Sequence, residues 1–215
     1  MNGIDSPGSL TDDKRRLLEA YLKLRAGAPS REGVISPRPA GTRVPLSFEQ
    51  ELIWIHSKLA PDLPLYNEIL TVRRRGPLDV GALERGLAEV VRRHEAWRTT
   101  FDVIGGEAVQ IVQPPPRFSL PACDLSAYPE GEREAEATRV ATEEARRPLD
   151  LVRGPIVRAK LVRMAADDHR LYVVVHQIVH DGVSVYSVFL PELITLYEAF
   201  ASGAPSPLPE PAVQY

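Results

Sequence analysis

The residue types best suited to chemistry gather in one stretch, HQIVHDG, which runs from residue 176 to residue 182. It follows the apolar run LYVVV, whose β-branched residues and two hydrophobic faces are typical of a buried central strand. Because side chains alternate along a strand, we expect His176 and Gln177 to point to opposite sides. Asp181 and Gly182 predict a tight turn, in which the glycine lets another backbone or a ligand come close. The stretch therefore predicts a polar site where a strand ends and a helix follows.

Three interpretations of these side chains are possible: a histidine of the core, a metal site and a cysteine nucleophile. In the first interpretation, His176 is a core residue bonded to Asp181 or to the backbone. Its spacing of four residues from His180 matches two zinc ligands on a helix, but the preceding valines predict a strand, and the stretch has no HExxH glutamate and no evident third ligand. Cys123, the only cysteine, has no partner base near it in the sequence. We therefore expect neither a metal nor a cysteine nucleophile.

Composition limits the classes of partner. The chain has 215 residues, 44% of them hydrophobic, which is enough to bury a core. Its 26 basic and 29 acidic residues create no overall field for nucleic acid or an anionic membrane, and the run Arg73-Arg74-Arg75 is interpreted as a solvated face. The single cysteine and an N-terminus without an apolar leader agree with a cytoplasmic location, and no apolar run approaches the ~18 residues of a membrane span.

The N-terminal part differs in composition from the rest. Residues 11–25 place apolar side chains at helical spacing after a capping Thr11, so residues 1–26 predict a helical linker or docking element. Residues 27–43 are rich in proline and glycine, which is typical of a linker. Residues 44–215 then form the main body.

The main body alternates helices and strands. A helix begins after Ser47, carries Gln50 and Trp54 on one packing face, and ends by Pro61. The later elements are a strand over 66–75, a helix from 79 to about 95, a hairpin of 99–103 with 108–113, a loop around Cys123, a helix over 130–147, strands over 156–164 and 169–179, and a helix over 184–200 that Pro191 interrupts. This order predicts an α/β (α+β) fold, with a mostly antiparallel sheet covered by helices.

Four stretches resemble one protein family. HQIVHDG is similar to the HHxxxDG motif of the condensation domains of nonribosomal peptide synthetases, which are relatives of chloramphenicol and dihydrolipoyl acetyltransferases. LSFEQELIWI resembles the family's opening Ser-x-x-Gln motif, RRHEAWRTTF its RHExLRTxF motif, and PLDLVRGPIVRAKL its third block. The stretches follow the family's order between Val44 and Tyr215. The resemblance implies the N-terminal, donor-side lobe of such a domain, with a chloramphenicol acetyltransferase-like half-fold.

The resemblance also implies a reaction and its partners. In this family two similar lobes form a V, and donor and acceptor peptidyl carrier proteins bring an acyl thioester and an amine to the motif on phosphopantetheine arms. The products are an amide and a free thiol. We expect no cofactor bound by this lobe. The expected partners are the two carrier proteins and the second lobe, rather than nucleic acid or a membrane.

The resemblance assigns site residues, with one departure. His176 matches the motif's first histidine, Asp181 its aspartate, which is regarded as structural, and Gly182 its glycine. Gln177 stands where the family has its second histidine, the base or positioning acceptor for the amine. Glutamine orients an amine by hydrogen bonding but has no protonation equilibrium near neutral pH. Loss of general-base assistance predicts a rate lower by ~10²- to 10⁴-fold.

Further side chains are candidates for supporting roles. His180 lies on the loop after the motif's first residues, and Ser184 is either a helix cap or a polar group near the tunnel. Arg98 belongs, with His94 and Glu95, to a stretch that predicts an internal ion-pair and capping network.

Two other functions stay open. If the glutamine marks a silenced site, the chain is a noncatalytic module that binds carrier proteins. A stand-alone acetyltransferase-like protein would instead form trimers, with an active site at each boundary between copies.

Overall fold

The structure is a computed structural model that describes residues 36–39 and 42–214. The predicted N-terminal helix and most of the predicted linker lie outside the described residues, so both stay predictions. The helices and strands are, in chain order, β1 (Val44–Pro45), α2 (Phe48–Leu59), β2 (Asn67–Arg75), α3 (Val80–Arg93), β3 (Thr99–Ile104), β4 (Glu107–Val112), β5 (Ala122–Asp124), α4 (Glu130–Arg146), β6 (Val157–Ala165), β7 (Asp168–His176) and α5 (Leu190–Ala201).

The larger sheet has the order β2-β7-β6-β5 and places β7 in its interior. β7 pairs antiparallel with β2 on one side and with β6 on the other. The prediction of a mostly antiparallel sheet is confirmed. β5, however, runs parallel to β6 and brings Cys123 opposite Val162, where the sequence predicted a loop. A three-residue strand whose partner is distant in the chain leaves almost no local signal.

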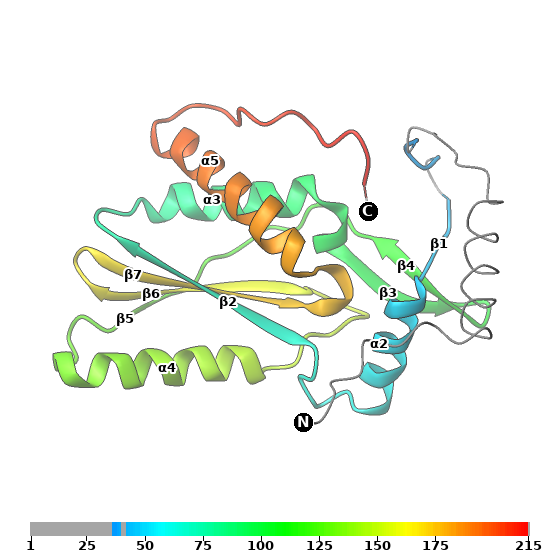
Figure 1. Ribbon diagram of the computed structural model, residues 1–215, viewed down its shortest axis with the longest axis horizontal. Helices are drawn as coiled ribbons and strands as arrows, with labels where there is room; N and C mark the ends of the chain where they lie inside the picture. Colours follow the sequence, from blue (N-terminus) through cyan, green and yellow to red (C-terminus); the bar gives the residue numbers. More distant parts are fainter. Residues whose placement is uncertain (1–35, 40–41, 215) are drawn as a thin grey trace, which may run out of the picture. The chain divides into compact units, whose positions relative to one another are not determined.

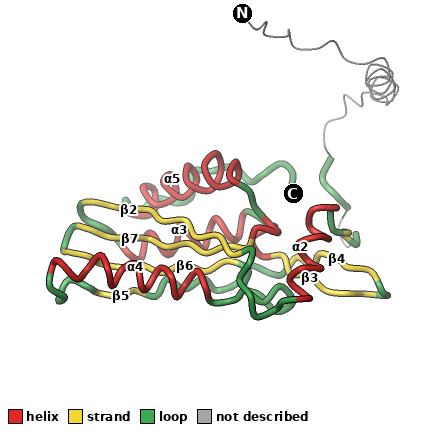
Figure 2. The backbone as a smooth tube through the Cα atoms, turned by 60° about the horizontal axis from the view of Figure 1, so that its bottom comes forward, coloured by secondary structure: helices red, strands yellow, loops and turns green. Residues whose placement is uncertain are grey.

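Helices cover both faces of this sheet. Figures 1 and 2 show α3 and α5 on one side and α4 on the other. Leu171, Val173 and Val175 of β7 belong to the core under α3 and α5, whereas Tyr172 packs with Ala137 of α4. This alternation follows from the two-residue period of a strand. The valine-rich run is therefore a buried central strand, as predicted, because both of its faces are covered.

A smaller sheet, with the order β1-β4-β3, supports α2. Gly105 and Gly106 connect β3 to β4 with φ values of 67° and 88°, which favour glycine in a tight hairpin, as predicted. Phe101 of β3 is fully buried, and its ring centroid lies 6.2 Å from that of Trp54 in α2. This packing fixes the helix whose N-terminal turn reaches the site.

Two elements end earlier than predicted. α3 stops at Arg93, and the short 3₁₀ segment Glu95–Arg98 follows. β7 stops at His176, because the backbone then turns into the 3₁₀ segment Gln177–Val179. In that turn the Ile178 N–H is used by the ring of His176 at 3.3 Å and not by a neighbouring strand. Because Ile178 and Val179 continue the apolar run, the prediction from hydrophobicity placed the end of the strand too late, at residue 179.

The last helix is interrupted before α5, in the region where Pro191 predicted a break. Residues Ser184–Phe189 form a π-helical segment, in which the Leu190 N–H bonds to the Val185 carbonyl. Proline has no N–H and its ring crowds the preceding turn, so a widened turn next to it is expected.

The basic run at the end of β2 is exposed, as predicted. Arg73 is paired with Asp168 of β7, with its Nε 2.9 Å from Oδ1. Among the described residues, no helix combines the length and the apolar character needed to cross a bilayer.

Candidate active site

Gln177 lies in the wall of a cavity of about 680 Å³. The walls come from α2, the end of α3, the Gln177–Val179 turn and the π-helical segment. Much of the lining is apolar, contributed by Leu52, Ile53, Ala96, Trp97, Val179, Val188 and Phe189. Gln177 is exposed, and within the described residues its side-chain amide makes no hydrogen bond. The amide is therefore open to a ligand in this cavity.

The turn that carries Gln177 is fixed at three points. The Gln177 N–H donates to the Tyr66 carbonyl at 2.9 Å. The Ile178 N–H donates to Nδ1 of His176, and the Ile178 carbonyl accepts from Nε2 of Gln50 at 3.0 Å. These contacts come from the residue before β2, the end of β7 and the first turn of α2. Two parts of the chain that are distant in sequence, together with the adjacent end of β7, thus orient one short turn.

His176 lines a different cavity, of about 330 Å³, so the two neighbouring residues face different spaces as predicted. Its side chain is buried, and Nδ1 accepts the Ile178 N–H, which leaves the hydrogen of the neutral ring on Nε2. Burial, together with the nearby charge of His180, lowers the pKa of His176 to about 4. A neutral ring that lines the other cavity does not replace the missing base.

His176→Asn is expected to remove part of the loss of stability in acid. Between the ordinary pKa of 6.5 and the folded-state value of about 4, the unfolded chain binds a proton that the folded chain does not. Stability should therefore fall as the pH drops through this window, by roughly 3 kcal/mol at most for this one group. Urea unfolding between pH 7 and pH 4 measures the slope. Asparagine keeps an acceptor for the Ile178 amide, so equal slopes in both proteins would contradict this assignment.

The His180 side chain connects the end of β7 to β2 through its two ring nitrogens. Its Nδ1–H donates to the His176 carbonyl at 3.1 Å, and its Nε2 lies 3.1 Å from Oε2 of Glu68. Both ring nitrogens are engaged, so His180 borders the cavity without a nitrogen free for a substrate amine. In the part of the chain that the structure describes, no group of three or more histidine, cysteine, aspartate or glutamate residues is arranged to hold a metal ion.

Asp181, and not Ser184, caps the final helix. Its Oδ1 accepts from both the N–H and the hydroxyl of Ser184, each at 2.7 Å, and these bonds hold the pKa of Asp181 below its ordinary value. Ser184 also lines the cavity. Gly182 begins the helix without a positive φ, and a Cβ there would meet no atom within 4 Å. The predicted tight turn at Gly182 was wrong, because the aspartate cap lets the helix start at once.

Arg98 lies away from this cavity and ties the end of α3 to the end of β4. Its guanidinium donates to the Gln113 carbonyl and, at 3.4 Å, to the Arg92 carbonyl. Its Nη2 lies 3.7 Å from Oε1 of Glu95. The contacts are those of a structural arginine between two elements.

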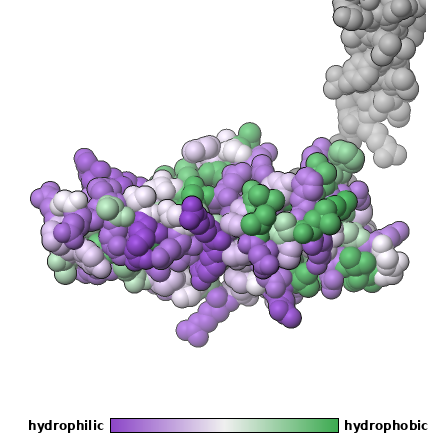
Figure 3. All heavy atoms as spheres, turned by 90° about the horizontal axis from the view of Figure 1, so that it is seen from below, coloured by the Kyte–Doolittle hydropathy of each residue, from purple (hydrophilic) through white to green (hydrophobic). Residues whose placement is uncertain are grey.

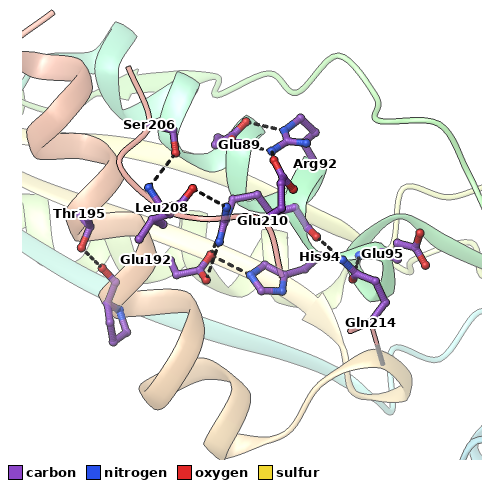
Figure 4. Close-up of polar contacts among 12 residues, drawn as sticks. Glu89, Arg92, His94, Glu95, Glu192, Thr195, Ser206, Leu208, Glu210 and Gln214 are labelled. Carbon is purple, nitrogen blue, oxygen red and sulfur yellow. Dashed lines mark hydrogen bonds and ion pairs between the residues drawn. The ribbon is translucent and has the colours of Figure 1, made fainter. Parts of the chain in front are cut away.

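The end of α3 is bound to α5 and to the C-terminal segment (Figure 4). His94, which lines the cavity, places its Nε2 2.8 Å from Oε2 of Glu192, and the buried Arg93 places its Nε 3.1 Å from the same oxygen. Gln214 accepts the Glu95 N–H and donates to the Arg93 carbonyl. Burial by itself would raise the pKa of Glu192, but the hydrogen bonds from Arg93 and His94 outweigh burial and lower it. This is the ion-pair network predicted for the stretch.

Two residues of the site were not identified from the sequence. Gln50 was interpreted as part of a packing face, yet it lines the cavity and bonds to the turn. Its place three residues after the cap Ser47 is the signal that could have identified it as more than a packing residue. Tyr66 gave no such signal. It contributes its backbone carbonyl, which accepts the Gln177 N–H, and every residue type has the same carbonyl.

Comparison with known proteins identifies the family. Residues 41–215 match the family model of the condensation domain. A linear gramicidin synthase protein of Brevibacillus parabrevis is 45% identical over 181 residues, which cover 84% of this chain and 2% of that protein. Phosphinothricin tripeptide synthetase PhsC of Streptomyces viridochromogenes is 35% identical over 208 residues, which cover 96% of this chain and 19% of that protein. The chain thus spans less than a fifth of the length of these two relatives.

Solved structures agree in fold. The first condensation domain of the CDA synthetase superposes with a TM-score of 0.71 at 27% identity, covering 79% of this chain and 43% of that one. The starter condensation domain of rhizomide synthetase RzmA gives a TM-score of 0.73 at 24% identity, covering 80% and 41%, and shows the same fold. The predicted chloramphenicol acetyltransferase-like architecture is confirmed. This chain therefore belongs to the condensation domain family of nonribosomal peptide synthetases, whose general role is peptide bond formation.

Proposed function

We propose that this chain is the donor-side, N-terminal lobe of a condensation domain that joins a carrier-bound acyl thioester to a carrier-bound amine. The observation that carries the proposal is the position of residue 177, on a fixed turn at the wall of a cavity of about 680 Å³. This volume lies in the range of small-molecule sites, and the apolar lining suits an acyl chain. The phosphopantetheine arms of donor and acceptor carrier proteins would deliver both substrates, without a cofactor held by the lobe.

The reaction needs the amine nitrogen to attack the thioester carbonyl carbon. A carbon–nitrogen bond forms, the carbon–sulfur bond breaks, and the proton lost by nitrogen ends on the departing sulfur. Oε1 of Gln177 can accept an N–H of the amine and hold the nitrogen against the carbonyl. It does not take up the proton near neutral pH. We therefore propose catalysis by orientation alone, at a rate well below that of a site with histidine.

A second candidate function rests on the same residue. Gln177 stands where the family has its second histidine, so the site lacks a base. This supports a domain that binds carrier proteins and forms no amide. In that case the cavity accepts a pantetheine arm without turnover. The two candidates differ in product formation and agree in carrier binding.

The second lobe is the proposed partner of an exposed apolar stripe on α2. Phe48, Leu52, Ile55 and Leu59 recur at helical spacing and are 49–78% exposed. Figure 3 shows apolar surface gathered toward the end of the molecule where α2 lies. An apolar stripe of this kind marks an interaction surface. Because the solved condensation domains above are more than twice as long as the matched region, we propose that the rest of such a domain covers this face.

Amide product is expected from carrier-bound substrates in the full-length context, and it should fall at least about tenfold in Val188→Trp, because the larger ring fills the cavity. Val188 is 38% exposed and lines the cavity, so the change need not disturb the core. Val103→Trp, on an exposed strand outside the cavity, is the matched control. Mass spectrometry measures the product. Equal product from both variants would contradict the assigned cavity, and carrier binding without product would favour the second candidate.

A further inference from the structure

Gln50 connects three parts of the molecule through one side chain. It is 3% exposed, and its Oε1 accepts the Ser47 N–H at 3.0 Å and an Nε2–H of Gln110 at 3.1 Å. Its own Nε2 donates to the Ile178 carbonyl at 3.0 Å. The side chain thus joins the N-terminus of α2, the smaller sheet and the turn that carries Gln177.

Only one of these contacts requires the amide nitrogen. A capping box is completed equally well by glutamate or glutamine at this position, and a negative charge there would favour the positive end of the helix. A carboxylate would also accept from Ser47 and Gln110. It has no hydrogen to give to the Ile178 carbonyl. The presence of glutamine at position 50 is therefore explained by the turn and not by the helix.

We propose that Gln50 is a positioning residue, which sets the direction of the Gln177 side chain by holding the turn from outside; this rests on the proposed function, in which residue 177 meets the substrates. The peptide before Gln177 is held by the Tyr66 carbonyl, and the carbonyl of the next residue, Ile178, is held by Gln50. Between these two points the turn cannot rotate about its own axis. Released from Gln50, it would carry the side chain away from the cavity wall, and a displacement of about 1 Å is enough to impair a reacting geometry.

Hydrogen exchange in the 215-residue chain tests this without any activity. Gln50→Glu keeps both acceptor contacts and removes the donor. The backbone amides of Gln177 and His180, which close the turn, should exchange about two- to tenfold faster by NMR, as the net worth of one hydrogen bond implies. Ser47→Ala is the matched control, because it removes the cap hydroxyl and leaves the Gln50 side-chain contacts in place. It should speed exchange in the first turn of α2 and leave the turn unchanged.

Acid should reverse the effect of Gln50→Glu. A protonated carboxyl group regains a donor, and burial favours the protonated form, so the amide resonance of Gln177 should return toward its native position as the pH falls toward about 5. Gln50→Leu, which has no donor at any pH, should show no such return. A merely structural role for residue 50 predicts the same pH response in both variants. Unchanged exchange at Gln177 in Gln50→Glu, or the absence of recovery in acid, would overturn the inference.

Measuring amide formation as well as hydrogen exchange distinguishes a failure of this inference from a failure of the proposed function. In the full-length context with histidine at position 177, Gln50→Glu should lower kcat more than it raises KM at neutral pH. If the turn responds by NMR but no variant forms amide, the positioning of the turn stands and the proposed function fails. If amide forms at equal rates with and without Gln50→Glu, and the turn is unchanged, the inference alone fails.

Discussion

Gln177→His is expected to raise the rate of amide formation by about 10²- to 10⁴-fold, measured with carrier-bound substrates in the full-length context. The residue stands on a fixed turn at the cavity wall, where the native amide makes no hydrogen bond with the described residues. An imidazole in this place accepts the proton that the attacking amine loses, which glutamine cannot do near neutral pH. Mass spectrometry of the released product gives the rate.

The pH profile identifies the reason for this gain. The rate of the histidine variant should rise with pH through the range of an ordinary imidazole pKa, about 6.5. Gln177→Asn, which keeps an amide and lacks a base, is the matched control and should show neither the gain nor this titration. If histidine gives no product while carrier binding persists, the binding module is the better account of the protein.

Glu192→Ala is expected to lower the free energy of unfolding by about 3–5 kcal/mol. The Arg93 side chain is 3% exposed, and Glu192 is its ion-pair partner across α3 and α5. Without the carboxylate, the one hydrogen bond that the buried guanidinium would keep among the described residues is that to the Leu208 carbonyl, at 3.3 Å. A buried charge without its partner costs more than the pair contributes. Urea unfolding at neutral pH measures the difference.

Glu192→Gln is the control for charge. It keeps an oxygen acceptor for Arg93 and His94, so its cost should be smaller. The folded-state pKa of Glu192 lies below the ordinary 4.5, so the contribution of its charge is present above that value and is lost as the pH falls through the folded-state pKa. The difference between native protein and Glu192→Gln should therefore shrink in acid. Equal costs for both variants at neutral pH would contradict a role for the charge.

The elements with strong local signals were predictable from the sequence. The valine-rich run became the interior strand β7, and the glycine pair at 105–106 became a hairpin turn. Ser47 caps α2, as its residue type and place before the helix indicated. Each of these depends on side chains within a few residues of one another, so each can be inferred without knowing the fold.

The elements with weak or misleading local signals could not be predicted from the sequence. β5 forms because its backbone pairs in parallel with the edge of β6. The residues next to Cys123 in the chain do not indicate this pairing. β7 ends at His176 because the ring of that residue takes the next available N–H, although Ile178 and Val179 prolong the apolar run. Hydrophobicity reports burial, and the strand is as buried as Ile178 and Val179 of the turn after it.

For the candidate site, the sequence was enough to name the residues: a histidine, a glutamine in place of the family's second histidine, an aspartate and a glycine, in a stretch that resembles the condensation domain motif. The contacts that each of these side chains makes became known from the folded structure. It directed His176 and Gln177 to different cavities, used Asp181 as a helix cap and engaged both nitrogens of His180. The contact between Gln50 and Ile178 joins residues 128 positions apart. A hydrogen bond of that reach is set by the packing of α2 against the end of β7, which no local pattern of residues encodes.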